Sequence, residues 1–293
     1  MTRGVPAGEG GYHDAPTAPL PSAPQADPGG PFAGRAETAG GQPPGTAERR
    51  RLPRWLRRFL IAVLAIALAG ALAFAALMAV TPSVSTAPLL AQAFDRAHGA
   101  AYPGPPVPSR FAAALVATED HRFYSEPGFD PIAIGRVLAG HVTGQPDQGG
   151  ATLYQQLAKM LYTPGRSGAG VQAEQIILGI KLDLTYSKAQ ILRLYADVEY
   201  FGRGYYGLAQ ASCGYFGVPP AGLTWPQAAL LAGLVQAPSA DNPVMHFTVA
   251  RAREAHVLGR LVATGTLTEA QAARAYRAPL HLVGGPGTGC AAR

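Results

Sequence analysis

The sequence predicts a mainly helical domain that is held at a membrane by one N-terminal helix. Residues 59–80 form an uninterrupted apolar run. The residues after this run contain repeated helix-start signals, whereas the alternating patterns of β-strands are scarce. Gly and Pro together are too few for a wholly disordered or collagen-like chain. With only two cysteines among 293 residues, a disulfide-rich scaffold is also excluded.

Residues 1–48 are rich in Gly, Pro, Ala, Ser and Thr and have almost no aliphatic periodicity. Such a segment cannot bury enough apolar surface to offset the entropy lost on ordering. We therefore expect residues 1–58 to be a disordered tail that ends in a basic cluster. The cluster consists of Arg49, Arg50, Arg51, Arg54, Arg57 and Arg58.

The 22 residues from Phe59 to Val80 are long enough to cross a bilayer as a helix. At ~1.5 Å per residue they span about 33 Å, against ~30 Å for the hydrocarbon core. A buried core helix rarely lacks polar residues for so long, and a cleaved signal peptide has a shorter apolar region near the N-terminus. The basic cluster precedes the helix, so the positive-inside rule predicts a cell-membrane, single-pass protein with a cytoplasmic N-terminus and residues 81–293 outside.

The outer part is expected to consist of a linker at 81–108, a helical domain at 109–283 and a frayed end at 284–293. Four sequence pairs fit capping boxes, in which a hydroxyl and a Gln side chain satisfy donors at a helix start. They are Thr152 with Gln155, Ser187 with Gln190, Thr224 with Gln227 and Thr268 with Gln271. Cys213 is expected to be a small buried residue and Cys290 to lie in the frayed end, so we do not expect them to pair.

The net charge of +6 is not gathered on the folded part, because residues 81–293 carry only three of these charges. A nucleic-acid-binding domain usually has a concentrated basic face. The histidines show no spacing typical of metal ligands. Neither a nucleic-acid partner nor a zinc site is therefore expected.

The first candidate site is the segment EDHRFY at residues 119–124, at the end of an apolar helical run. Burial beside this run would raise the pKa of Glu119 and suit it to act as a general base near neutral pH. The alternative is a solvent-exposed helix in which Glu119 pairs with Arg122.

The second candidate is QGGATLYQQLAK at residues 148–159. Glycines that lead into a capped helix start offer free N–H groups to an anion. Gln155, Gln156 and Lys159 follow, and Lys159 shares a face with the Gln pair. This arrangement suits a phosphate and sugar hydroxyls, and the alternative is a plain helix with a surface lysine. A third set, Lys188, Ile191 and Tyr195, lies on one helical face and is more typical of a core.

Taken together and in order, these segments resemble the peptidoglycan glycosyltransferase (transglycosylase) family, from about Phe111 to Ala275. The family pattern ED-x-x-F-x-x-H-x-G is matched at Glu119, Asp120, Phe123 and Gly128. The pattern G-x-S-T-x-x-Q-Q-x-x-K is matched at Gly149, Thr152, Gln155, Gln156 and Lys159. The pattern K-x-x-I-x-x-x-Y-x-N is matched at Lys188, Ile191 and Tyr195. The chain ends without room for a penicillin-binding transpeptidase domain, so it is similar to the monofunctional members.

The sequence departs from the family at several motif positions. Glu126 replaces the motif His, Ala151 the motif Ser and Asp197 the motif Asn. The third motif, R-K-x-x-E, supplies the second essential Glu of the family and is eroded here. Counting back from Lys188 places Gln175 at that position, whereas counting forward from Arg166 places Glu174 there. The second catalytic carboxylate is therefore assigned to Glu174, with Gln175 as the alternative occupant.

The resemblance implies a lysozyme-like helical fold with a small membrane-proximal lobe, for which residues 131–142 are the candidate. It implies that lipid II is joined to a growing glycan, that Glu119 acts as general base and that undecaprenyl pyrophosphate leaves. Substrate binding is assigned to Asp120, Arg122, Phe123, Thr152, Gln155, Gln156, Lys159, Arg166, Gln175, Lys188 and Tyr195.

No cofactor is required by the sequence, although a divalent metal, Mg²⁺ or Mn²⁺, can assist at the pyrophosphate in some members of the family. The implied partners are lipid II, the glycan strand, the membrane and other proteins of cell-wall synthesis or division. Two other functions stay open: a lipid II-binding or scaffold protein without catalysis, and a glycan-cleaving enzyme on the same fold.

Overall fold

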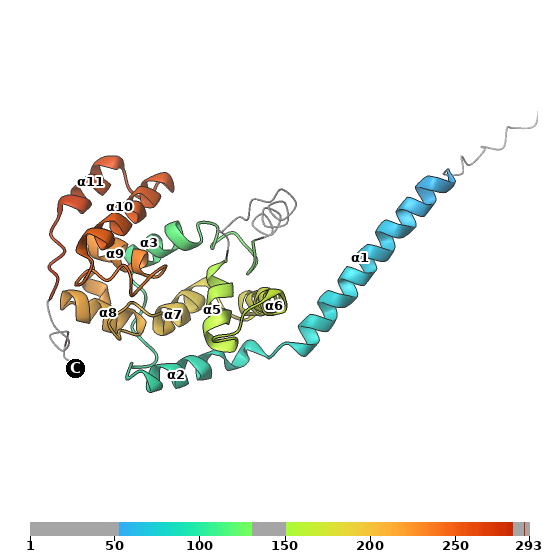
Figure 1. Cartoon of the computed structure of the whole chain (residues 1–293), viewed down its shortest axis with the longest axis horizontal. Helices are drawn as coiled ribbons and strands as arrows, with labels where there is room; N and C mark the ends of the chain where they lie inside the picture. The colour runs from blue at the N-terminus through green and yellow to red at the C-terminus, as the bar shows by residue number, and fades with distance from the viewer. Residues whose placement is uncertain (1–52, 131–150, 284–289, 291–293) are drawn as a thin grey trace, which may run out of the picture. The chain divides into compact units, whose positions relative to one another are not determined.

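The computed structural model describes residues 53–130 and 151–283 together with Cys290. Contacts divide the chain into two units, Met1–Leu56 and Arg57–Arg293, and the helical domain belongs to the second. The described residues are mainly helical, as predicted, and their one β-type pairing is an isolated bridge between Tyr200 and Tyr206. The helices, labelled as in Figure 1, are α1 Arg54–Val80, η1 Val84–Thr86, α2 Ala87–Ala97, α3 Ser109–Glu119, α5 Leu153–Tyr162, α6 Ala169–Thr185, α7 Lys188–Val198, α8 Gly207–Phe216, η2 Pro220–Gly222, α9 Trp225–Leu234, α10 Phe247–Ala263 and α11 Glu269–Arg277.

Helix α1 contains the predicted membrane span at residues 59–80. It has no charged side chain beyond its first turns and none of its residues is buried. Its most apolar window has a mean hydropathy of 2.7, and within the described ranges it belongs to the one helical stretch long and apolar enough to cross a bilayer.

The segment 81–108 differs from the expected linker, because much of it is folded onto the domain. Helix α2 buries Ala87, Ala91 and Asp95 against neighbouring helices, α7 above all. The Tyr186 hydroxyl donates to the Val84 carbonyl oxygen over 2.9 Å. The Pro and Gly residues of the segment suggested a linker, but they lie mostly outside α2 and leave it an amphipathic helix.

All four predicted capping boxes are present, at the starts of α5, α7, α9 and α11. In α5, for example, Thr152 Oγ1 accepts from the Gln155 N–H at 3.3 Å, and Gln155 Oε1 accepts from the Thr152 N–H at 3.3 Å. Each box satisfies donors that a helix start otherwise leaves unpaired.

Helix α9 lies at the centre of a packed group with α3, α10 and α11 (Figure 1). Every residue from Pro226 to Leu234 is buried. A helix that is apolar all round is typical of such a central position. At Gly233 an added Cβ would lie 3.2 Å from Cβ of Arg253 on α10, so the absence of a side chain lets the two helices approach closely.

Cys213 and Cys290 form a disulfide, which corrects the expectation that they do not pair. The residues after α11 return to the domain, where the Gln227 side chain donates to the Leu280 carbonyl oxygen and the Val283 N–H donates to the Tyr215 carbonyl oxygen. Tyr215 and Cys213 are both in α8, so this path brings the C-terminal segment back to its partner cysteine. The sequence offered no signal for the return, because the two cysteines are 77 residues apart.

Candidate active site

Glu119 is the last residue of α3 and is half-buried where that helix ends. The next residue, Asp120, leaves the helical conformation with φ −156° and ψ 72°. Its Oδ2 accepts from the Leu153 N–H at 3.0 Å, in the first turn of α5. The adjacent pair Glu119–Asp120 therefore joins the end of α3 to the start of α5, and the two sequence motifs meet in space.

Gln156 holds the Glu119 carboxylate from α5. Its Nε2 donates to Glu119 Oε2 at 3.1 Å and to the Ala151 carbonyl oxygen at 3.4 Å. Its Oε1 accepts from the Tyr195 hydroxyl at 2.7 Å, and Tyr195 on α7 is wholly buried. A chain of hydrogen bonds thus runs from α7 through α5 to the candidate base.

Burial raises the pKa of the Glu119 carboxyl above its usual value. The hydrogen bond from Gln156 and the charge of Arg253 oppose this rise, whereas Asp120 adds to it. A carboxyl whose pKa is moved toward neutrality accepts a proton more readily than an ordinary glutamate, as a general base requires. The alternative of a solvent-exposed ion pair with Arg122 is not what the structure shows, because Arg122 pairs with Asp130.

Arg253 on α10 supplies positive charge that acts on Glu119. The guanidinium is held by an ion pair with Asp241, in which Nε lies 3.3 Å from Oδ2, and by a hydrogen bond to Gln236. Arg253 lies against α9 at Gly233, where the two helices approach closely. Sequence reasoning did not select Arg253, since it is far from every motif and lies on a helix rich in other arginines.

A second carboxyl group, that of Glu199, also acts on this site. Glu199 follows α7, and its Oε1 accepts from the Tyr200 N–H at 3.1 Å. The charge of Glu119 raises the pKa of its carboxyl, whereas the Tyr195 hydroxyl and the charge of Lys159 lower it. Burial is the main cause that raises the pKa of Glu199 to about 7. The sequence analysis missed this residue, because it lies between Asp197 and an aromatic pair that is typical of a core.

A buried aromatic layer supports the segment that follows Glu119. Phe123 is fully buried and stacks on Tyr154 with ring centroids 5.3 Å apart. The Lys188 ammonium lies over both rings and is 2.9 Å from Asp183 Oδ1. These contacts make Phe123 and Lys188 supports of the site. Their assignment to substrate binding stays a prediction.

Glu126, which replaces the motif His, is buried close to Asp120. Burial first, and then Asp120, raises the pKa of its carboxyl. Lys188 donates to the Glu126 backbone oxygen at 2.7 Å, so the loop is tied to α7. Gly128 then turns the chain with φ +74°, where an added Cβ would lie 2.5 Å from the Gly179 oxygen of α6. No other residue fits this turn without displacement of the backbone.

Of the remaining predicted residues of α5, only Lys159 is exposed toward solvent. It is three residues beyond Gln156 and therefore shares its helical face. Thr152 and Gln155 have their side chains engaged in the capping box, which limits what they can offer a substrate. The candidate glycines at 149 and 150 lie outside the described residues, as does the lobe predicted at 131–142.

Arg166, Glu174 and Gln175 form a separate set around the start of α6. Arg166 binds Glu174 through two contacts, 2.8 Å to Oε2 and 3.3 Å to Oε1. Gln175 points elsewhere, since its Nε2 donates to Thr163 Oγ1 at 2.8 Å. Neither side chain contacts Glu119, Gln156 or Lys159 through any interaction found here among the described residues. The assignment of Glu174 as second carboxylate remains a prediction.

The assistance of a divalent metal at the pyrophosphate also stays a prediction. Within residues 53–130 and 151–283, no group of three or more His, Cys, Asp or Glu side chains is arranged to hold a metal ion. The carboxylates near Glu119 are instead engaged by backbone N–H groups and by Gln156. The described residues do not form a fitting donor set, and no step proposed below uses a metal.

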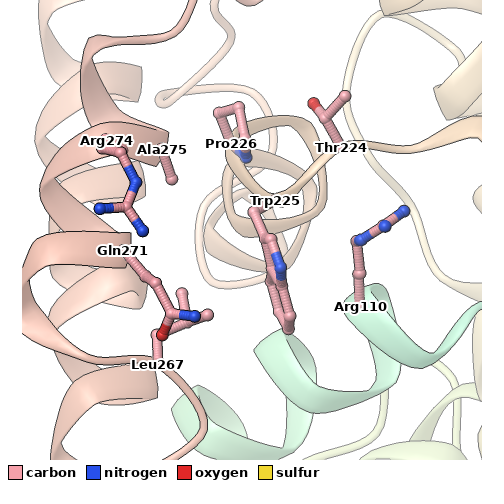
Figure 2. A pocket seen from close by; sticks show the side chains of 8 residues that line it. All are labelled: Arg110, Thr224, Trp225, Pro226, Leu267, Gln271, Arg274 and Ala275. Carbon is pink, nitrogen blue, oxygen red and sulfur yellow. The ribbon is translucent and has the colours of Figure 1, made fainter.

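A pocket of about 400 Å³ lies at the opposite end of α3, between α3, α9 and α11. Figure 2 shows Arg110, Trp225 and Arg274 around it. Arg110 is in the first turn of α3 and Glu119 is at its last residue, so the pocket is separate from the candidate base.

The sequence matches the family model described as Transglycosylase over residues 89–262. A candidate transglycosylase of Cupriavidus necator is 34% identical over 176 residues, which cover 60% of this chain and 76% of that protein. Penicillin-binding protein 1A of Aquifex aeolicus is 37% identical over 175 residues, 59% of this chain and 24% of that protein. Penicillin-binding protein 1A of Mycobacterium tuberculosis is 36% identical over 166 residues, which cover 55% of this chain and 20% of that protein.

Among solved structures, the crystal structure of penicillin-binding protein 1A from Haemophilus influenzae matches 60% of this chain and 17% of that chain, with 21% identity and a TM-score of 0.36. That similarity is too low to carry an argument. The family model covers more than half of the chain, so the site belongs to a glycosyltransferase of the type that builds cell-wall glycan. The chain is a member of the transglycosylase family, and it spans about three quarters of the Cupriavidus relative but only about a quarter of the penicillin-binding proteins.

Proposed function

We propose that this protein polymerises lipid II into glycan strands and releases undecaprenyl pyrophosphate. The observation that carries the proposal is the half-buried Glu119, whose pKa is raised and whose carboxylate is held by Gln156 of the second motif. Family membership supports the class of reaction, and this geometry supports the role of the residue.

In the proposed reaction Glu119 takes the proton from the 4-hydroxyl of the acceptor, lipid II. The acceptor oxygen attacks the anomeric carbon of the growing glycan and inverts it from α to β. The bond from that carbon to the pyrophosphate breaks, and undecaprenyl pyrophosphate leaves with the electron pair. Negative charge grows on the leaving group, and Lys159 on the exposed face of α5 is the cation proposed to stabilise it.

An experiment with purified full-length protein and labelled lipid II tests this function. Glycan polymer is the expected product. Lipid II that is bound but unchanged would instead identify the binding or scaffold protein, an alternative favoured by the engagement of Glu174 with Arg166. Cleavage of finished glycan without use of lipid II would identify a hydrolytic enzyme.

The role of the third motif is tested by a pair of variants. If Glu174 is the second carboxylate, Glu174→Gln lowers the polymerisation rate by at least about 10²-fold, as loss of a catalytic carboxylate does. Gln175→Ala then has little effect, since within the described part of the chain its amide is hydrogen-bonded to Thr163 and not to Glu119. Initial rates with labelled lipid II measure both. Equal rates for Glu174→Gln and wild type would remove Glu174 from the mechanism and leave its ion pair with Arg166 as its role.

The orientation in the membrane is also a proposal. The disulfide between Cys213 and Cys290 supports it, because disulfides persist outside the reducing cytoplasm. A reporter fused after Arg293 is expected to be extracellular, and one fused before Met1 cytoplasmic. Impermeant labelling of intact cells measures both, and a cytoplasmic C-terminal reporter would contradict the assignment of a domain that meets exported lipid II.

A further inference from the structure

The pocket between α3, α9 and α11 has a lining that the proposed function does not use (Figure 2). Its lining residues are Arg110, Thr224, Trp225, Pro226, Leu267, Gln271, Arg274 and Ala275. Its volume of about 400 Å³ lies within the range of roughly 300–1,000 Å³ that is usual for small-ligand sites. Neither Glu119 nor Gln156 lines it, so a ligand in this pocket would not occupy the candidate active site.

The charge of this pocket is of one sign, because two arginines line it and none of its described lining residues is acidic. Arg274 is exposed, and its guanidinium makes no ion pair or hydrogen bond with the residues that the structure describes. Arg110 is also exposed and uses Nη1 to donate to the Leu223 carbonyl oxygen at 3.1 Å. The other N–H groups of that guanidinium remain for a ligand. Two cations without carboxylate partners favour an anionic ligand.

The polar side chains around the two arginines add donors and no free acceptor. Gln271 Oε1 accepts from the Thr268 N–H at 2.8 Å in the capping box of α11. The group that Gln271 has left for a ligand is therefore its NH₂, which only donates. The Thr224 hydroxyl is engaged, since it donates to Gln227 Oε1 at 2.9 Å. The ligand must therefore be rich in acceptors.

An apolar wall lies between the two positive charges. Trp225 is half-buried and packs against the core, and beside it Pro226, Leu267 and Ala275 are buried. In the view of Figure 2, Trp225 lies between Arg110 on one side and Gln271 and Arg274 on the other. The ligand that fits this order has an acceptor group at each end and apolar atoms between them.

Side chains, and not a helix start, provide the donors of this pocket. The N–H and the hydroxyl of Thr224 at the start of α9 are both engaged by Gln227 Oε1. A guanidinium matches a carboxylate through two parallel N–H···O hydrogen bonds. Two separate guanidinium groups therefore favour two separate carboxylates over one compact phosphate.

We propose that this pocket binds a short acidic peptide. One carboxylate lies at Arg110, a second lies at Arg274 and the Gln271 amide, and an apolar side chain lies against Trp225. Such a peptide can be free, or it can be attached to the glycan strand, and only the attached form rests on the proposed function. In both forms the recognised chemistry is two carboxylates on either side of an apolar group.

Trp225 itself reports binding, because the chain has two tryptophans and the other, Trp55, lies in the first turn of α1. In full-length Trp55→Phe protein in detergent, Trp225 is the only tryptophan. We expect its fluorescence to change saturably with acetyl-Ala-Glu and not with the neutral acetyl-Ala-Gln-amide. The proposal is overturned by the absence of a saturable change, by an equal change with the neutral peptide, or by inorganic phosphate that displaces the peptide at an equal concentration.

Variants in the same Trp55→Phe background assign the carboxylates to the arginines. We expect Arg274→Met to raise the Kd for acetyl-Ala-Glu about tenfold or more, because a hydrogen-bonded charge is lost. Arg110→Lys should raise it several-fold, since lysine keeps a donor for the Leu223 carbonyl oxygen but loses the planar fork. Far-UV circular dichroism shows whether each variant keeps its helices.

Arg277→Met is the matched control, because Arg277 is an exposed arginine of the same helix that does not line the pocket. We expect it to keep the parent Kd. An unchanged Kd in both pocket variants, or a rise in Arg277→Met equal to that in Arg274→Met, overturns the proposal.

A last titration identifies the source of the peptide. N-acetylmuramoyl-Ala-Glu carries the same two carboxylates on a sugar of the glycan. Tighter binding of this compound than of acetyl-Ala-Glu assigns the pocket to peptides on the glycan strand, and equal or weaker binding assigns it to free peptides. If wild-type protein makes no polymer, the proposed function fails and the titration still decides the pocket. If polymer is made but neither peptide binds, only the pocket inference fails.

Discussion

Glu119→Gln is expected to lower polymerisation of lipid II by about 10²–10⁴-fold, the usual contribution of general base catalysis. The amide is nearly the same shape as the carboxylate, but it cannot take the proton from the acceptor hydroxyl. The Gln156 Nε2 loses a charged acceptor, yet Asp120 still joins α3 to α5 through the Leu153 N–H. The fold and the affinity for lipid II should therefore survive, and initial rates and binding are measured on the same preparation.

Glu269→Gln is the control for this variant. Glu269 is an exposed carboxylate in the first turn of α11, outside the candidate site. Its variant should keep the wild-type rate. A wild-type rate in Glu119→Gln would remove Glu119 from the mechanism, and a loss of lipid II binding in that variant would show that the carboxylate holds the substrate.

Lys159→Met is expected to lower kcat by about 10²–10³-fold, the usual effect of losing one group that stabilises a charged transition state. The methionine keeps most of the length of the side chain but removes its charge. Lys159 is exposed and shares a face of α5 with Gln156, and its positive charge lowers the pKa of Glu199. The pyrophosphate is more charged as it leaves than when it is bound, so the loss should be larger in kcat than in KM.

Arg277→Met serves as the comparison, since Arg277 is an exposed cation in the last turn of α11. It should leave both kinetic constants unchanged. If Lys159→Met raises KM and spares kcat, the lysine binds substrate and leaving group equally and does not stabilise the transition state.

The local parts of this fold could be predicted from the sequence because their causes are local. A capping box needs only a hydroxyl and a glutamine three residues apart, and all four predicted boxes are present. The resemblance assigned Glu119 and Gln156 to one site, because the order of motifs carries information that spacing lacks.

The charges that complete the site could not be predicted in this way. Arg253 acts on Glu119 because two helices approach closely at Gly233, and the charge of Glu119 acts in turn on the buried Glu199 after α7. The Cys213–Cys290 disulfide depends on a return of the chain after α11. Each of these depends on contacts between residues that are far apart in sequence, and no local pattern marks them.

In the proposed reaction, glycan grows as Glu119 takes a proton and pyrophosphate leaves. The most direct measurement counts both products, glycan polymer and undecaprenyl pyrophosphate, from labelled lipid II with purified wild-type protein and with Glu119→Gln. We expect one undecaprenyl pyrophosphate for each disaccharide added by wild type, and almost none of either product from Glu119→Gln at equal lipid II binding. Release of the two products in equal amounts and at the wild-type rate by Glu119→Gln would contradict it.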